Sequence, residues 1–140
     1  MDHVIHTEFI LKKHPLPLQL DHKALSECVE ACMECEQACT ACADACLGEG
    51  RPDELVRMIR LDQDCADICS ATARILSRQT ATVPRLVQEL LHACALACKV
   101  CGEECLRHAG SMEHCRVCAD ACDRCQEACT RLIAVSAASA

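Results

Sequence analysis

The feature that most limits how this chain can fold is a run of six cysteines between Cys28 and Cys46. They stand at positions 28, 32, 35, 39, 42 and 46, so the spacings alternate between four and three residues. An α-helix has about 3.6 residues per turn, and this alternation therefore places all six side chains on one face of a single helix. Leucine or isoleucine normally occupies such a face, because apolar volume drives helix packing. The cysteines predict a helix whose buried face is built from thiols.

Three later segments carry a similar spacing and predict three further helices. We expect helices over about residues 21–47, 52–78, 84–109 and 112–135. Asp21 and Ser111 are the expected N-caps of the first and fourth helices, and Gly48 and Gly110 are expected to end the first and third. Four helices of this length joined by short turns predict an all-α fold, an antiparallel up-down-up-down four-helix bundle.

The chain is expected to form a single domain. Residues 1–20 are predicted to form an N-terminal arm or short helix, because Pro15 and Pro17 follow a short apolar segment. Residues 21–135 form the expected cysteine-lined bundle. Residues 136–140 contain only alanine and serine, and we expect this tail to fray.

The cysteine content separates this chain from secreted disulfide scaffolds. Those scaffolds are short, rich in loops and carry an even number of cysteines, whereas this chain has 17 cysteines but only four glycines and four prolines in 140 residues. No secretory signal or membrane-spanning segment is recognisable. The net charge of −7, without tryptophan or tyrosine, argues against nucleic acid binding. We therefore expect a cytoplasmic protein whose reduced thiols serve metal or redox chemistry.

The helical period also predicts which side chains of the last three helices face the interior. They are Leu55, Met58, Asp62, Cys65, Cys69, Thr72 and Leu76; Val87, Leu91, Cys94, Cys98, Cys101, Cys105 and His108; and Cys115, Cys118, Cys122, Cys125, Cys129 and Leu132. In an antiparallel bundle these residues sort by end. The leucine end gathers Leu25, Leu76, Val87, Leu91 and Leu132. The histidine end gathers Cys46, Met58, His108, Met112, His114 and Cys115.

The repeated Cys-x-x-x-Cys pattern favours Cu(I) as the bound metal. Cysteines four residues apart lie on neighbouring turns, so one helix can offer two thiolates to one ion. Zn²⁺ requires four tetrahedral ligands, whereas the soft Cu(I) ion is selected by thiolate and thioether groups. One monovalent ion per thiolate would also cancel the buried charge. The predicted thiolate ligands are Cys28, Cys32, Cys35, Cys39, Cys42, Cys46, Cys65, Cys69, Cys94, Cys98, Cys101, Cys105, Cys115, Cys118, Cys122, Cys125 and Cys129.

Five further residues are candidate metal ligands. His108 continues the thiol stripe of its helix, and His114 stands beside Cys115. Met58 and Met112 are either soft ligands or ordinary packing residues. Asp62 either binds metal or is hydrated near the histidine end. His22 and His92 fall outside the stripes, and we expect them on the surface.

The pattern predicts storage of Cu(I), and several other functions fit it in part. Zinc or mixed-metal sequestration and a thiol-based oxidant sink stay open as alternatives, although thiols four apart on a rigid helix have poor disulfide geometry. A purely structural role is disfavoured, because 17 small cysteine side chains have too little volume to fill a core to native density. The single Glu89-x-x-His92 motif is insufficient for a di-iron carboxylate site. No nucleophile paired with a base is recognisable, so we do not expect an enzyme.

The ladder of Cys-x-x-x-Cys and Cys-x-x-Cys motifs over about residues 21–133 resembles that of a known family. The family is that of the bacterial cysteine-rich copper storage proteins, in particular its cytosolic branch. The resemblance implies a four-helix bundle filled by many Cu(I) ions and assembly into homotetramers. It also implies that histidines and methionines lie at the end where metal enters, which here is the histidine end with His108, His114, Met58 and Met112. Exposed apolar residues such as Leu96, Val100, Ile59 and Ile75 offer a surface for assembly, and a copper chaperone is a possible partner.

Overall fold

The periodic cysteine stripes correspond to long helices in the computed structural model, which describes residues 5–139. The helices are α1 (Ile5–Lys12), α2 (His22–Gly48), α3 (Pro52–Leu76), α4 (Pro84–His108) and α5 (Glu113–Ser139). No strand occurs among the described residues. The all-helical fold predicted from the spacing is therefore confirmed.

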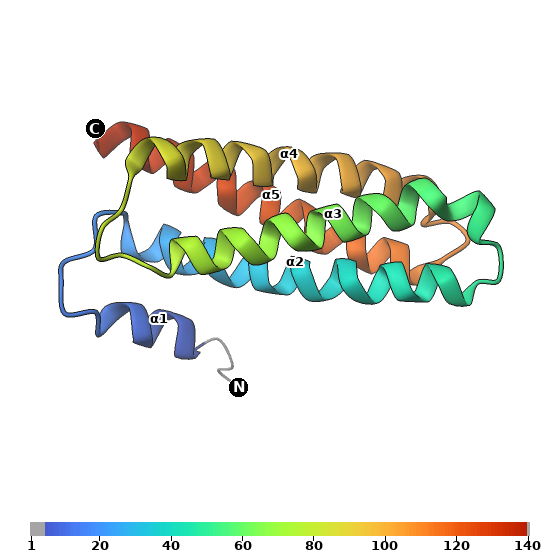
Figure 1. Cartoon of the computed structure of the whole chain (residues 1–140), viewed down its shortest axis with the longest axis horizontal. Coiled ribbons are helices and arrows are strands. Elements are labelled where there is room, and N and C mark those ends of the chain that lie inside the picture. Colours follow the sequence, from blue (N-terminus) through green and yellow to red (C-terminus); the bar gives the residue numbers. More distant parts are fainter. Residues whose placement is uncertain (1–4, 140) are drawn as a thin grey trace.

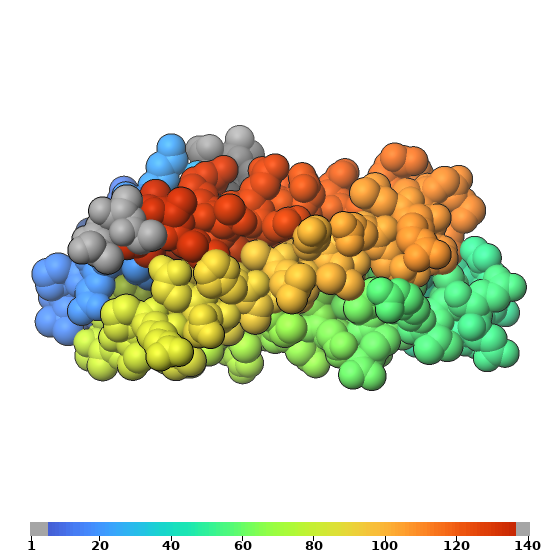
Figure 2. Space-filling view, turned by 90° about the horizontal axis from the view of Figure 1, so that it is seen from above, coloured from blue at the N-terminus to red at the C-terminus, as the bar shows by residue number. Residues whose placement is uncertain are grey.

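The four long helices lie alongside one another and reverse direction at each connection (Figure 1). α2 packs against α3 and α5, and α4 packs against the same two helices, which closes the arrangement around a common interior. The short helix α1 lies outside this arrangement, against α2. Figure 2 shows the side chains of α4 and α5 meeting along one long face of the molecule.

Helix starts follow the sequence signals closely. Asp21 caps α2, because its Oδ2 accepts a hydrogen bond of 2.9 Å from the Ala24 N–H. Pro52 and Pro84 are the first residues of α3 and α4, where a proline's missing N–H leaves no intrahelical bond unmade. The predictions for α2 and for the two proline starts are confirmed to within a residue or two.

Two turn predictions were wrong. Gly48 is not the left-handed residue that follows α2 but its last helical residue, and the left-handed backbone that favours glycine occurs at Gly50, with φ of 78°. Ser111 does not cap α5, which begins at Glu113; its hydroxyl instead donates to the His108 carbonyl at 3.4 Å. Local composition identified both turns, but the backbone path through each depends on how the helices pack.

The C-terminal tail is included in the last helix. α5 continues to Ser139, so residues 136–139, which we expected to fray, belong to the helix. Alanine has the highest helix propensity, and a helix already formed over many turns is extended at low cost. Residues 1–4 and 140 lie outside the described part of the chain, including His3.

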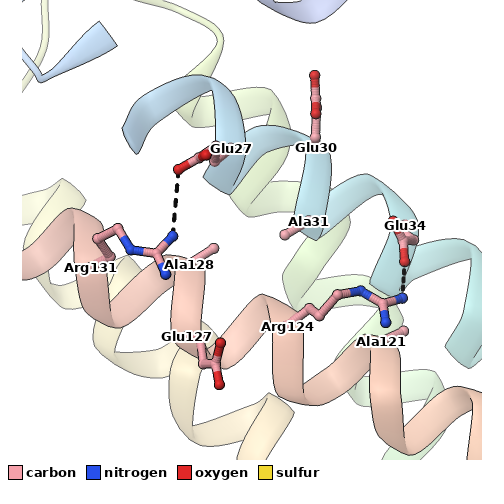
Figure 3. Close-up of a pocket in the computed structure, with 9 residues that line it drawn as sticks. All are labelled: Glu27, Glu30, Ala31, Glu34, Ala121, Arg124, Glu127, Ala128 and Arg131. Carbon is pink, nitrogen blue, oxygen red and sulfur yellow. Dashed lines mark hydrogen bonds and ion pairs between the residues drawn. The ribbon is translucent and has the colours of Figure 1, made fainter. Parts of the chain in front are cut away.

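Charged residues line the outer seam between α2 and α5. Glu27 pairs with Arg131 at 3.4 Å, and Glu34 pairs with Arg124, so that two ion pairs join α2 to α5 along a surface groove (Figure 3). Its remaining lining residues are Ala31, Ala121, Ala128, Glu30 and Glu127. Exposed pairs of this kind contribute at most about 1 kcal/mol each. The groove contains no thiol, so the chemistry lies elsewhere.

The leucine end is a closed apolar layer. Leu25, Leu76, Leu91 and Leu132, one from each long helix, are fully buried. Burying one such side chain contributes about 1.5–3 kcal/mol. The thiols lie in the interior between this leucine layer and the histidine end.

Among the described residues no helix is long and apolar enough to cross a bilayer.

Candidate metal centre

All of the cysteines face the interior of the helical arrangement. None of the 17 has more than 2% of its surface exposed, and none forms a disulfide. They stand on the faces that the helical period predicted, together with the buried Met58, Asp62 and Thr72 of α3. We call this set of 17 side chains the thiol core. Its burial excludes bulk water from the sulfur atoms.

The sulfur atoms of α2 and α5 approach one another at successive levels of the thiol core. The Sγ–Sγ distances are 3.8 Å for Cys28–Cys129, 3.6 Å for Cys32–Cys125, 3.8 Å for Cys35–Cys122, 3.7 Å for Cys39–Cys118 and 3.8 Å for Cys42–Cys115. A disulfide requires about 2.05 Å. Two sulfurs bound to one ion at about 2.3 Å each lie about 3.8 Å apart when the angle at the metal is about 110°. The observed distances therefore suit a shared metal ion without movement of the backbone.

Pairs within one helix account for a smaller part of these contacts than we expected. Cys35–Cys39 at 3.8 Å and Cys65–Cys69 at 3.9 Å are such pairs. Most of the short sulfur–sulfur distances instead join different helices, as in Cys69–Cys98 at 3.8 Å between α3 and α4. Two thiols from a single helix are therefore only part of each possible site.

Groups of four thiols overlap along the core. The ligand atoms of each group lie within 4.8 Å of one another, and the groups include Cys32/Cys94/Cys125/Cys129, Cys35/Cys65/Cys69/Cys98, Cys35/Cys39/Cys65/Cys122 and Cys39/Cys101/Cys118/Cys122. Cys35, Cys39, Cys65 and Cys122 each belong to more than one of these groups. Neighbouring sites in this part of the core would therefore share thiolates, so bridged ions suit it better than a set of separate sites.

Asp62 lies inside the thiol core and not in a hydrated position. Its side chain is fully buried, and Oδ1 accepts hydrogen bonds from the thiols of Cys101 at 3.2 Å and Cys118 at 3.4 Å. Oδ2 is also buried and has no hydrogen-bond partner among the described residues. Burial raises the pKa of the Asp62 carboxyl to about 8. Of the two alternatives for Asp62, this burial argues against hydration near the histidine end.

The histidine end presents imidazole nitrogen to sulfur. His114 Nδ1 lies 3.4 Å from Cys42 Sγ and 3.7 Å from Cys115 Sγ, and these three residues form a possible metal group with Cys46. The side chains of His108 and His114 are 24% and 27% exposed. Met58 and Met112, at 0% and 2%, lie beneath the surface. The histidines are therefore the solvent-accessible donors of this end.

Two carboxylates at this end were not found by sequence reasoning. Glu104 lies one turn before His108 on α4, and its Oε2 is 3.1 Å from His108 Nε2. Glu49, just beyond α2, has its Oε2 3.0 Å from His114 Nε2. The four-residue spacing of Glu104 and His108 is a signal that could have revealed the first pair. The second pair is separated by 65 positions and is visible only in the fold.

Burial makes the thiols of the histidine end weak acids. It raises the pKa of Cys46 to about 12 and also raises the pKa of Cys115. These thiols are therefore protonated in the metal-free protein at neutral pH. A metal ion that binds them must displace the protons, so binding releases acid.

The histidines away from the thiol stripes differ from one another. His92 is exposed, as expected. His22 is half-buried, and its Nε2 is buried without a hydrogen-bond partner among the described residues, so the expectation of a surface position was wrong. α1 packs on α2 near the N-terminal end of that helix (Figure 1), which explains why this region is less open than the sequence suggests.

Comparison with known proteins identifies the family. Residues 21–134 match the profile of the copper storage protein family, described as "Copper storage protein". This chain belongs to that family. The segment matched to the copper storage proteins contains every cysteine of the chain and leaves out α1.

Solved structures of copper storage proteins are similar to this chain over most of its length. Ccsp from Streptomyces lividans, loaded with 10 copper equivalents, has a TM-score of 0.90 at 49% identity and covers 92% of this chain and 98% of its own. Another structure of that protein, described as cytosolic and holding five coppers, has a TM-score of 0.79 at 54% identity and covers 80% and 93%. The Cu(I)-bound Bacillus protein BsCsp3 has a TM-score of 0.68 at 37% identity and covers 76% and 94%.

Proposed function

We propose that this chain stores many Cu(I) ions in the cytosol by binding them to the thiol core. The observation that carries the proposal is the succession of buried four-thiol groups along the interior, three of which overlap by sharing thiols. A catalytic metal site is usually small and keeps an open position for substrate, whereas these groups fill the interior and are buried. Copper-loaded relatives and a relative described as cytosolic support the same function.

Charge and softness favour Cu(I). Each thiol that binds metal becomes a thiolate, and uncompensated charge inside a protein is costly. One Cu(I) for each thiolate leaves the interior near neutrality, and thiolate is the ligand that this soft ion prefers. Sulfurs 3.6–4.0 Å apart can be shared by neighbouring Cu(I) ions.

We propose all 17 cysteines as ligands, with His108, His114, Met58, Met112 and Asp62 as additional donors. Asp62 is supported by its orphaned Oδ2 in the middle of the core. His108 and His114 are supported by their partial exposure at the end where an ion from solvent first meets the core. Met58 and Met112 lie just beneath them and are buried. Ions therefore enter at the histidine end.

Anaerobic titration with Cu(I) in the presence of a strong Cu(I) chelator tests the storage function. We expect the reduced protein to withdraw copper from the chelator until about one ion is bound per thiol, because each ion neutralises one thiolate. Saturation after one or two ions would refute storage. A variant with Cys35→Ser and Cys65→Ser should lose capacity, because each of these thiols belongs to two of the overlapping groups.

Zinc sequestration is the second candidate, and one observation favours it. The four-thiol groups have the ligand number that Zn²⁺ prefers. However, groups that share Cys35, Cys39, Cys65 or Cys122 cannot all hold separate four-coordinate ions. Competition distinguishes the two metals: Cu(I) should displace Zn²⁺ completely from the loaded protein. Retention of zinc at excess Cu(I) would favour zinc storage.

We further propose that the storage unit is the antiparallel four-helix bundle of residues 21–135, with residues 1–20 as an arm, and that copies assemble into a homotetramer. Leu96 is 61% exposed, and Val100, Ile59 and Ile75 are half-buried. Light scattering after size-exclusion chromatography measures the assembly, and Leu96→Glu should reduce its mass if this residue lies at an interface. A copper chaperone is the proposed partner for copper exchange.

A further inference from the structure

Both histidines of the histidine end contact a glutamate through the ring nitrogen Nε2. Glu49 Oε2 lies 3.0 Å from His114 Nε2, and Glu104 Oε2 lies 3.1 Å from His108 Nε2. The glutamates come from different elements, since Glu49 follows α2 and Glu104 is within α4. The same contact is thus made twice, with the same ring nitrogen, by residues unrelated in sequence.

The carboxylate decides which nitrogen of a neutral imidazole carries the proton. An ionised glutamate can only accept hydrogen bonds, so the proton must be on Nε2. The lone pair is then on Nδ1. In His114 this is the nitrogen that lies 3.4 Å from Cys42 Sγ and 3.7 Å from Cys115 Sγ. The opposite tautomer would place the Nε2 lone pair against a carboxylate oxygen at 3.0 Å, which is repulsive.

We propose that Glu49 is a positioning residue for copper uptake. It fixes both the tautomer and the orientation of His114, so that Nδ1 and the sulfurs of Cys42 and Cys115 face one arriving Cu(I) ion together. This inference rests on the proposed storage function and adds to it the residue that prepares the first binding position. Metal-binding histidines are commonly held in this way, with the second ring nitrogen donating to a carboxylate. Glu104 acts on His108 through the same nitrogen.

Glu49 provides the cleaner test of the two glutamates. Glu104 is almost fully buried and also bonds to Arg57 at 3.4 Å and Arg107 at 3.5 Å, so its loss would leave those contacts broken. The Glu49 side chain is 34% exposed. Its backbone N–H bonds to the Cys46 carbonyl at the end of α2 whatever the side chain is. Glu49→Gln therefore changes the partner of His114 and leaves the helix end intact.

The first measurement uses the reduced, metal-free protein and does not depend on copper. Long-range ¹H–¹⁵N correlation spectra near pH 8, above the ordinary histidine pKa of about 6.5, report the tautomer of each neutral imidazole. We expect His114 to carry its proton on Nε2 in the wild type and to populate both tautomers in Glu49→Gln, because an amide can donate as well as accept. The matched control is Glu54→Gln, which removes a glutamate of the same end that pairs with Arg51 at 3.1 Å.

The second measurement is the rate of Cu(I) uptake in anaerobic stopped-flow experiments. We expect the first uptake phase of Glu49→Gln to be about 10-fold slower than wild type, at the lower end of the roughly 10–100-fold cost in metal affinity or activity that the loss of such a carboxylate brings, with unchanged capacity and melting temperature. Glu54→Gln should match wild type. An unchanged tautomer, or a changed tautomer with an unchanged rate, overturns the role of Glu49. If the wild type takes up no more than one or two ions, the storage function itself fails, and the tautomer result stands apart from it.

Discussion

Replacing Asp62 by asparagine should change how the stability of the metal-free protein depends on pH. Asp62 is fully buried, with one oxygen bonded to thiols and the other without a partner among the described residues. Burial raises the pKa of its carboxyl from 3.8 to about 8, so the folded protein holds a proton there that the unfolded chain loses. The contribution of Asp62 to stability is therefore greatest below about pH 4. It falls as pH rises through the interval from about 4 to about 8.

The size of the effect follows from linkage. Within that interval the folded state binds one more proton than the unfolded state at this position, which lowers the free energy of unfolding by about 1.4 kcal/mol per pH unit. Between pH 5 and pH 8 the loss is roughly 4 kcal/mol. Asparagine does not titrate, so Asp62→Asn should lack this part of the pH dependence. Titratable groups that do not contact residue 62 are common to both proteins and cancel in the comparison.

Urea unfolding of the reduced, chelator-treated protein, followed by circular dichroism at several pH values, measures the difference. The free energy of unfolding of the wild type minus that of Asp62→Asn should fall by roughly 4 kcal/mol from pH 5 to pH 8. Asp64→Asn is the matched control, because Asp64 lies two positions away on the surface and pairs with Arg60 at 2.9 Å. Its curve should run parallel to that of the wild type. Parallel curves for wild type and Asp62→Asn would refute the reasoning.

Three further predictions concern other parts of the molecule. His108→Ala should slow copper uptake in stopped-flow measurements with little change in total capacity, and a large loss of capacity would contradict its place at the histidine end. Leu91→Ala, at a fully buried position, should lower the free energy of unfolding by about 2–5 kcal/mol in urea titrations and leave capacity intact. Gly48→Ala should stabilise the protein by up to about 1 kcal/mol, because nothing lies within 4 Å of the added methyl group. Gly102→Ala should not, because its methyl group would lie 3.3 Å from Cys122 Cβ on the facing helix; equal gains at both glycines would show that α4 and α5 are not closely packed there.

The helical period was sufficient to predict the interior. A side chain's face on a long helix depends only on its position in the sequence, so Leu55, Asp62 and Leu132 were placed correctly among the buried residues. Turns are different, because a glycine or serine in a short connection can serve more than one backbone path. The structure selects Gly50 over Gly48 for the left-handed conformation. That choice depends on where the packed helices leave the chain.

Contacts between helices were the second feature that could not be predicted from the sequence. The pairing of Glu49 with His114 joins the end of α2 to the start of α5, and no spacing in the sequence predicts it. The surroundings of Asp62 illustrate the same point. Its stripe placed it inside, but only the fold shows that thiols from α4 and α5 bond to Oδ1 while Oδ2 is left without a partner in the described part of the chain. The kind of chemistry was readable from sequence, whereas its detailed arrangement required the fold.

The closed leucine end makes the two ends of the thiol core unequal in their access to solvent. Leu25, Leu76, Leu91 and Leu132 are fully buried beyond Cys28, whereas His108 and His114 reach solvent at the opposite end. An ion bound near Cys28 has other occupied positions between itself and the exit. With entry at the histidine end, as proposed above, such an ion must pass along the shared thiolates to reach solvent. Copper near Cys28 should therefore exchange more slowly than copper near Cys46, so that one part of the store is readily drawn on and the other is held back.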